Sequence, residues 1–496
     1  MIAGDMLPMS VVEGTGLRNL ISFLEPTYTV PCRQTMTVRL EKMYREAAAS
    51  LREILSSADK VAITTDAWTA LTTESYVTVT VHFFSDWVLQ NAILQTRSMP
   101  VRHTAENMAH VLQAAVDNWG IAGKVAACVH DNASNILLAN SLYLEWESHR
   151  CFAHTLLKLG SVSTVVGGAS HLVSHFHHST VATEALKGKQ AEQNLPQHCL
   201  IQHVKTRWNS IYDMFERLLE QRWALAAVLS DRGFTKLTDA RALELADASW
   251  HVMEELLPVL KSLKCATTAL CGETELSISM VHPITATLLS RYLRPTEGEP
   301  PKVREFKGKV AESLSSRIEP ENTDTAQKAA MVASFLDPRN KNLRFTTDEV
   351  RAAVHTKVGD MLSNLPASLP DHHEEQALAP IPEKRAKHAD AMLAFFGDEY
   401  FTEEPATTAR SELERYLCEE SISPTQDPAL WWKLHESKYK RLSQLAKHYL
   451  CIPATSMPAE RVFSAAGLIV NRLRSRLLPS HVDMLIFLNK NKSIVK

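Results

Sequence analysis

The sequence lacks the features that would place it in several common protein classes. No apolar run reaches the length of a transmembrane helix, and the N-terminus has no basic start followed by an apolar stretch, as a signal peptide would. Its eight cysteines form no CxxC pair, so neither a zinc finger nor a disulfide framework is indicated. We therefore expect reduced thiols in an intracellular protein that has no membrane partner.

The chain also lacks a net charge of one sign. The formal charge at pH 7 is −3 over 496 residues, so the overall balance does not indicate nucleic-acid binding, and any basic surface must be local. No internal repeat of 20–50 residues stands out. The length predicts two or three domains of ordinary globular composition.

The first half of the chain contains a pattern typical of a mixed sheet. Residues 60–68 are apolar on both faces, as in a central strand, and residues 75–85 alternate in β-branched style. Thr104 is the expected N-cap of a helix that ends at Gly120, and a second helix is expected near Asn132 or Ser134. Further strands are expected at 89–100, 124–131 and 148–154. The order β-β-β-α-β-α-β predicts an α/β fold with a mixed sheet.

Helical periodicity dominates elsewhere. We divide the chain into a helical lead-in at 1–56, the first part of an α/β core at 57–155, a helical region at 156–440, and C-terminal helices at 441–496. Within the third segment, residues 364–390 are rich in proline, histidine and charge, which predicts a flexible loop.

Two aspartates stand at the ends of predicted strands. Asp66 lies in or at the end of the first strand, and Asp131 ends the fourth. If these strands are parallel neighbours, both carboxylates reach the same edge of the sheet, where their repulsion favours a bound Mg²⁺ or Mn²⁺. The alternative is that both are ordinary turn or helix-capping residues.

Seven motifs occur in an order that resembles the hAT-superfamily transposases, and in particular the zinc finger BED domain-containing proteins derived from them. The motifs are TTDAW (64–68), VHDNASN (129–135), CFAHTL (151–156), KTRWNS (205–210), SFLDPRNK (334–341), DPALWW (427–432) and IPATSMPAERVFSAAG (452–467). The last is the most specific, because it is long and rich in small and charged residues. The resemblance covers nearly the whole chain from about residue 8.

The resemblance implies an RNase H-like fold interrupted by a large helical insertion. It also implies that Asp66, Asp131 and Glu460 together hold divalent metal, Mg²⁺ or Mn²⁺. In such transposases water attacks a phosphodiester at the transposon end, a hairpin forms on the flanking DNA, and the freed 3′-OH attacks target DNA. Glu460 would then be the third acid of a site whose other members lie far upstream. Read alone, it is one acid in the first turn of a helix, where the helix dipole favours negative charge.

The resemblance further implies roles for aromatic and basic residues. Trp68 would stand near the active site, although a core tryptophan is an equal alternative. Arg207 and Trp208 would contact DNA, by pairing with phosphate and by stacking on an extruded base; the alternative is the start of an amphipathic helix. Cys151 and His154 would lie beside the active site, since no second pair of zinc ligands is readable.

The C-terminal run divides into a basic and an apolar part. Its arginines, which include Arg461, Arg472 and Arg474, make the most basic local stretch, which either contacts the DNA backbone or is a solvated helix face. An apolar stripe follows, and the resemblance implies that it serves dimerisation, while packing onto the chain's own core is the alternative. The stripe consists of Val482, Leu485, Ile486 and Leu488.

One departure from the family pattern bears on function. Members of this type usually carry a BED zinc finger that reads DNA sequence, and none is readable here, because Cys32 has no CxxC partner. The first expectation is therefore a nuclear, dimeric, DNA-associated regulator that also contacts other nuclear proteins. An active metal-dependent transposase and an inert dimerisation scaffold are the alternatives.

Overall fold

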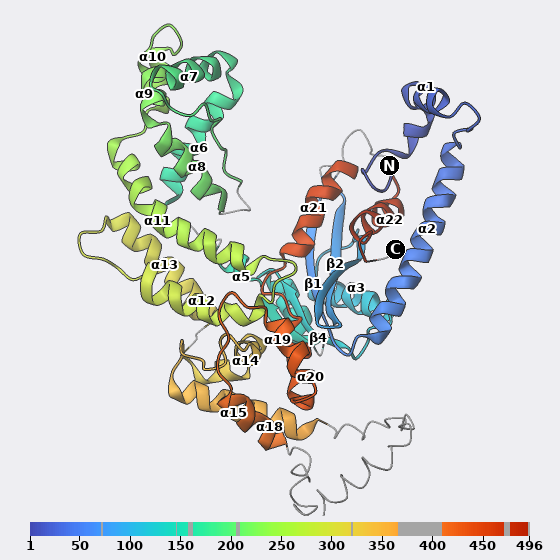
Figure 1. Ribbon diagram of the computed structural model, residues 1–496. Coiled ribbons are helices and arrows are strands. Elements are labelled where there is room, and N and C mark those ends of the chain that lie inside the picture. The colour runs from blue at the N-terminus through green and yellow to red at the C-terminus, as the bar shows by residue number, and fades with distance from the viewer. Residues whose placement is uncertain are drawn as a thin grey trace, which may run out of the picture.

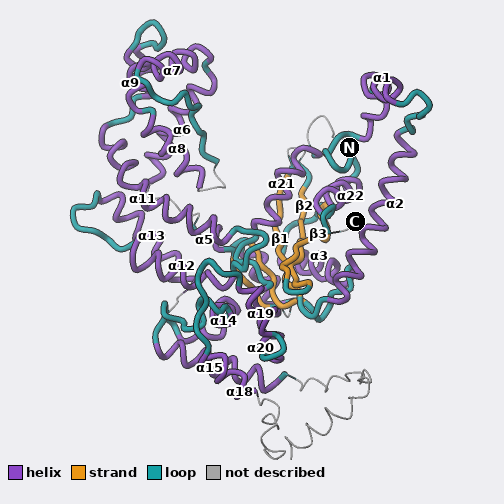
Figure 2. The backbone as a smooth tube through the Cα atoms, viewed as in Figure 1, coloured by secondary structure: helices purple, strands orange, loops and turns teal. Residues whose placement is uncertain are grey.

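The computed structural model describes residues 1–70, 73–144, 146–156, 162–204, 209–318, 321–365, 409–470 and 477–494. Figure 1 shows a sheet-containing part and a long helical part side by side. In the described residues all strands gather in one sheet and the rest of the regular structure is helical (Figure 2). None of the described helices combines the length and the apolar character needed to cross a lipid bilayer.

The sheet has five strands in the order β3-β2-β1-β4-β5. Strands β1 (Val61–Thr69), β2 (Ser75–Ser85) and β3 (Val88–Ser98) form an antiparallel meander, and β4 (Val125–His130) and β5 (Glu147–Arg150) continue it in parallel. The predicted order of strands and helices and the RNase H-like mixed sheet are confirmed. The crossover helices are α3 (Ala105–Asn118) and α4 (Ser134–Leu142).

The alternation of buried side chains along β1 explains why this strand is apolar throughout. Val61 and Ile63 pack into the core formed with α2 (Arg33–Ser57), α3 and α4, whereas Ala62 points into the core of the helical part. Both faces are therefore covered, as expected for a central strand. Thr104 caps α3 by accepting a hydrogen bond from the Asn107 amide at 3.3 Å, as predicted.

One predicted boundary is wrong, and another is confirmed without the expected cap. The fifth strand ends at Arg150 rather than continuing to residue 154, because Cys151 begins a turn into the short helix α5 (Phe152–Thr155). Helix α4 begins at Ser134, as expected, but no side chain caps it. Its N-cap is Ala133, whose amide donates to the Asp131 carboxylate at 3.2 Å.

The helical part follows β5 and separates it from the C-terminal helices. It contains no strand in its described residues. Its longer helices are α6 (Ser163–His178), α7 (Thr180–Glu192), α8 (Asn209–Glu220), α9 (Arg222–Ser230), α10 (Leu237–Leu243), α11 (Asp247–Leu270), α12 (Val281–Thr287), α13 (Pro301–Ile318), α14 (Ala329–Leu336), α15 (Asp348–Asn364), α18 (Ala409–Cys418) and α19 (Pro428–His435). The loop predicted at 364–390 lies outside the described residues, apart from residues 364 and 365 at the end of α15.

The C-terminal helices return to the sheet. Helix α20 (Lys440–Leu450) packs with α14, α21 (Met457–Ile469) lies against β1 and β2, and α22 (Pro479–Lys490) lies along the edge strand β3. At that edge the side-chain amide of Asn491 both accepts from the Ile93 amide and donates to the Ile93 carbonyl, each at 2.8 Å. These bonds satisfy strand groups that would otherwise be open to pairing with another chain.

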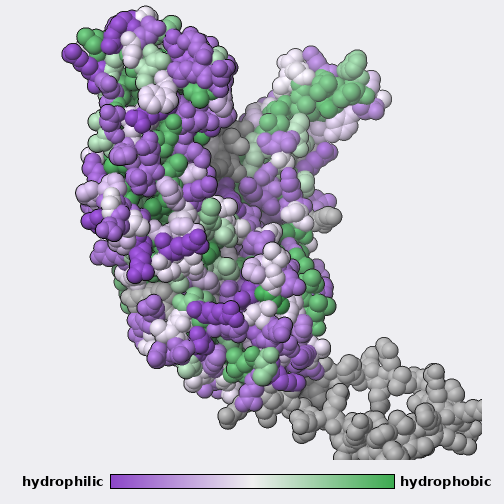
Figure 3. All heavy atoms as spheres, turned by 60° about the vertical axis from the view of Figure 1, so that its left-hand side comes forward, coloured by the Kyte–Doolittle hydropathy of each residue, from purple (hydrophilic) through white to green (hydrophobic). Residues whose placement is uncertain are grey.

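The N-terminal segment forms an arm beside the sheet. It contains α1 (Thr15–Leu24), which has no buried residue and leads into α2. Leu20, Phe23 and Leu24 are exposed on it, and hydrophobic side chains gather on this arm in Figure 3. The predicted helical lead-in is therefore present.

Candidate functional site

The central parallel strands bring the two predicted aspartates to one edge of the sheet. The pairing of β1 with β4 runs to Thr64 and Val129, and Asp66 and Asp131 each lie two residues further along their strand direction. Parallel neighbours carry both side chains to the same carboxyl edge, which is where functional groups collect in such sheets. One carboxylate oxygen of Asp66 accepts a hydrogen bond from the Ala67 amide at 2.8 Å.

Glu460 reaches this edge from the far end of the chain. The segment before α21 is fixed to α5 by two hydrogen bonds, from the Phe152 amide to the Ala454 carbonyl at 3.1 Å and from the Ser456 amide to the Cys151 sulfur at 3.3 Å. Glu460 then lies in the first turn of α21, and its Oε1 is 3.5 Å from Nε2 of His154. The helical position expected for Glu460 is confirmed.

Cys151, His154 and Glu460 form a compact group. One ligand atom of each lies within 4.8 Å of the other two, and among the described residues this is the one set of three potential metal-ligating side chains that is so close. The sequence placed Cys151 and His154 beside the site, but it did not predict that Glu460 would join them as a trio. The CxxH spacing was the available signal, and the third member lies too far away in sequence to be recognised by spacing.

The charges of the site act on one another. Burial, together with the carboxylates of Glu460 and Asp131, raises the pKa of Asp66 to about 7, and His154 opposes this effect. Burial alone would lower the pKa of His154, but the Cys151 sulfur and the charges of Glu460 and Asp66 outweigh it and raise that pKa to about 9. Asp66, Asp131, Glu460 and His154 therefore share one electrostatic environment.

The carboxylates of Asp66, Asp131 and Glu460 have the donor chemistry of a hard divalent-cation site, but within the described ranges the three ligand atoms that lie within 4.8 Å of one another belong to Cys151, His154 and Glu460. Three carboxylates supply the oxygen ligands that Mg²⁺ and Mn²⁺ prefer, and a cation between them would offset their mutual repulsion. Asp66, Asp131 and Glu460 are the residues that would hold such an ion. The trio with Cys151 and His154 mixes sulfur, nitrogen and oxygen, a set better suited to a softer metal.

Trp68 packs within the protein beside this edge. Its ring stacks on Tyr76 with a centroid distance of 4.9 Å and lies 5.5 Å from the ring of Phe463 on α21. The side chain is half-buried, and its indole nitrogen is buried without a hydrogen-bond partner. The packing thus agrees with the core alternative, while the position near Asp66 agrees with the site alternative.

The predicted DNA-contacting arginines have different outcomes. Arg461 forms an ion pair with Glu273 and donates to the Cys271 carbonyl at 2.9 Å, so it joins α21 to the segment that follows α11. Sequence reasoning missed Glu273 as the partner of this arginine. The remaining predicted DNA contacts lie outside the described residues: Arg207, Trp208, Arg472 and Arg474.

The apolar stripe of α22 is in the chain's own core. Val482, Leu485 and Ile486 are at most 1% exposed, and Leu488 is half-buried against the same cluster. The packing alternative therefore holds for these residues in the single chain. Exposed leucines in the C-terminal quarter lie on α19, where Leu430 and Leu434 are 54% and 70% exposed, and at the N-cap of α22, where Leu478 is 59% exposed.

The fold and the position of the acids define an RNase H-like domain joined to a large helical region. Comparison with known proteins agrees. Residues 64–150 match the family described as ZBED1 RNase-like domain, and residues 412–492 match the hAT family C-terminal dimerisation region. The chain therefore carries both of these hAT-type domains.

Curated relatives match along essentially the whole chain. The human zinc finger BED domain-containing protein 4 is 25% identical over 100% of this chain and 43% of its own length. A putative transcriptional regulator of Talaromyces stipitatus and the putative AC transposase of Zea mays are each 24% identical, over 61% and 62% of their lengths. The chain thus spans between two fifths and about three fifths of the length of these relatives.

Proposed function

We propose that this chain is a transposase-derived, self-associating protein that acts on DNA in the nucleus, as a regulator and partner of other nuclear proteins. One observation carries the proposal: an RNase H-like sheet with acids at its carboxyl edge occurs in the same chain as a hAT dimerisation region. The names of the relatives, which include a transcriptional regulator, zinc finger BED proteins and transposases, support the same class of role.

Metal-dependent cleavage of phosphodiesters is the second candidate function. The observation in its favour is that Glu460, on the last quarter of the chain, interacts electrostatically with both Asp66 and His154 at the sheet edge. A bound Mg²⁺ or Mn²⁺ would supply Lewis-acid stabilisation of the charge that develops on the phosphate oxygens. The chain itself supplies the three carboxylates that hold the ion, and His154 orients Glu460.

DNA incubation with the purified protein tests both candidates. The wild type, Asp66→Asn and Asp360→Asn are compared in Mn²⁺, with DNA retention and strand cleavage measured in parallel. Asp360 is exposed on α15, far along the chain from the site, so it controls for loss of one carboxylate.

The outcomes separate the candidates. Cleavage by the wild type and the control, lost in Asp66→Asn, supports the enzymatic function. Retention of DNA by all three proteins without cleavage supports the regulator alone. If no protein binds DNA while sedimentation shows a dimer, both are wrong and an inert dimerisation scaffold is the remaining function.

A further inference from the structure

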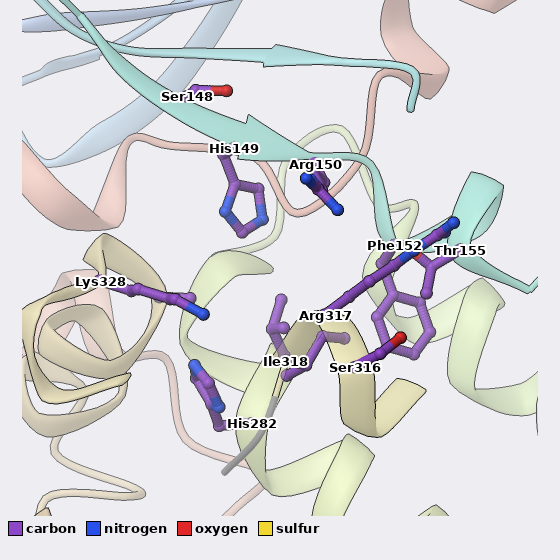
Figure 4. Close-up of a pocket in the computed structure, with 12 residues that line it drawn as sticks. Ser148, His149, Arg150, Phe152, Thr155, His282, Ser316, Arg317, Ile318 and Lys328 are labelled. Carbon is purple, nitrogen blue, oxygen red and sulfur yellow. The ribbon is translucent and has the colours of Figure 1, made fainter. Parts of the chain in front are cut away.

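A cavity of about 270 Å³ lies between the sheet and the helical region, away from the three acids. Its walls come from four parts of the chain: the end of β5 with helix α5, the start of α12, the end of α13, and the start of α14. Figure 4 shows the side chains of His149, Lys328 and His282 around a common space, and the Arg317 side chain extends along its edge toward Thr155. The volume greatly exceeds the roughly 30 Å³ that one water molecule occupies in the liquid.

Almost all of the polar side chains that line the cavity are positively charged or can donate a hydrogen bond. Arg150, Arg317 and Lys328 line the cavity, and no aspartate or glutamate is among its lining residues. None of these three cations has an ion pair within the described residues. Burial, and to a lesser extent the charge of Arg150, hold the pKa of Arg317 below its usual range.

The neighbouring groups do not neutralise this charge. With its amide oxygen turned toward α13, Asn132 accepts from the Arg317 guanidinium at 3.0 Å, but Asn132 is neutral. Glu147, the acid on β5, instead accepts from the Ala329 amide at 2.6 Å and does not line the cavity. Helix α14 begins at Ala329, and the Glu147 carboxylate on its first amide offsets the positive end of the helix dipole, so the positive field of the cavity comes from the side chains.

Two histidines that line the cavity each have a buried ring nitrogen without a hydrogen-bond partner. His282 is 1% exposed and stacks on Phe345, and its Nδ1 is buried without a hydrogen-bond partner. Nε2 of His149 is likewise buried without a partner. Burial lowers the pKa of His282 to about 3, so this ring is neutral and the positive charge of the cavity comes from the arginines and the lysine. Buried polar atoms of this kind are costly unless a ligand satisfies them.

We infer that this cavity binds one phosphate group. Two guanidinium groups and an ammonium around a cavity that is open to solvent at Arg150 and Lys328 match the charge and the several oxygen acceptors of a phosphate better than those of a halide or a single carboxylate. Nδ1 of His282 and Nε2 of His149 then gain partners. The phosphate comes either from a small molecule, such as inorganic phosphate or a phosphate ester, or from a DNA end. This inference goes beyond the proposed function and does not depend on metal at the acidic site.

Inorganic phosphate is the first probe. Thermal unfolding and calorimetric titration are run with phosphate against chloride at matched ionic strength, for the wild type, Arg150→Gln, Arg317→Gln and Lys302→Gln. Lys302 is exposed on the same helix as Arg317, so it controls for the loss of one positive charge. A second arm replaces phosphate with duplex DNA with or without a terminal phosphate.

The inference predicts that phosphate stabilises the wild type and the Lys302 variant, and that either arginine variant weakens its binding about tenfold or more, as expected for loss of a charged hydrogen bond. Without phosphate, Arg317→Gln should unfold at the same temperature as the wild type or higher, because a repulsion is removed. If phosphate has no effect but the arginine variants alone lose affinity for phosphorylated DNA ends, DNA is the source and the site stands.

Two results would overturn the inference. One is a wild type that responds to neither phosphate nor phosphorylated DNA ends. The other is an Arg317→Gln protein that is destabilised without phosphate yet responds to phosphate like the wild type, because the arginine would then be a structural residue. Neither result bears on cleavage by the acidic site, which Asp66→Asn tests separately.

Discussion

Asp483 offers a quantitative test of how α22 is fixed to the edge of the sheet. Its side chain is 8% exposed and accepts a hydrogen bond from the Thr96 amide of β3 at 2.6 Å. Burial raises the pKa of Asp483 to about 6, although the Thr96 amide, Arg97 and Tyr44 each act to lower it. We predict that Asp483→Asn will change the pH dependence of stability, because the amide keeps an acceptor for Thr96 and removes the charge.

The sign and size follow from the two pKa values. The pKa of Asp483 is higher in the folded chain than its ordinary value of 3.8, so folding favours the protonated carboxyl. The contribution of the protonated Asp483 carboxyl to the free energy of unfolding of the wild type is fully present below pH 3.8. It is lost as the pH rises to about 6. One pKa unit corresponds to about 1.4 kcal/mol, so the total loss is about 3 kcal/mol. The free energy of unfolding of the variant minus that of the wild type should therefore grow by about 1.4 kcal/mol per pH unit between pH 4 and 6 and stay constant above that.

Hydrogen exchange of the peptides that contain β3 and α22 is the suitable assay, because a chain of this length need not unfold in one step. Variant and wild type are compared at each pH, which cancels the intrinsic pH dependence of exchange. Asp360→Asn, which removes an exposed carboxylate on α15, is the control. A difference between Asp483→Asn and the wild type that is the same at pH 4 and pH 6 would refute the reasoning, since Asp483 would then ionise normally in the folded chain.

Two further predictions concern the C-terminal quarter. Asn491→Ala should destabilise the contact between α22 and β3 by about 2–4 kcal/mol, because both backbone groups of Ile93 lose a buried partner. Asn489→Ala removes bonds to the less buried carbonyls of Ala3 and Gly4 and should cost less in the same exchange experiment. Replacing Leu430 and Leu434 with glutamate should weaken self-association at least tenfold in sedimentation experiments, because both are exposed one turn apart on α19 within the dimerisation region. An unchanged dimer would exclude this face of α19 as the contact.

The sheet could be predicted because its signals are local. Periodicity and flanking turn residues identified each strand, and the side-chain cap at Thr104 was readable from three residues. The fifth strand was extended too far because CFAH is as apolar as a strand, whereas the structure turns there into α5 and fixes the turn by a hydrogen bond from the Phe152 amide to the Ala454 carbonyl. That bond joins segments that no local pattern connects.

The acidic site was predictable only in part. Asp66 lies within β1 just beyond its pairing with β4, Asp131 directly follows β4, and their meeting required only that β1 and β4 be parallel neighbours. Glu460 was added through resemblance, because nothing in its own helix distinguishes it from a first-turn acid. The pairing of Arg461 with Glu273 was not predictable, since an exposed arginine in a basic run gives no indication of a partner in another element.

The sequence by itself determined the elements: which segments form strands, where helices begin, and which acids stand at strand ends. These properties depend on side-chain periodicity and backbone preferences within a few residues. Tertiary structure decided which distant groups share a space. It placed Glu460 beside His154, buried the stripe of α22 in the core, and gathered Arg150, Arg317 and Lys328 around one cavity. The reason is that burial and electrostatic interaction depend on distances in space. These distances are fixed only when the helical region packs against the sheet.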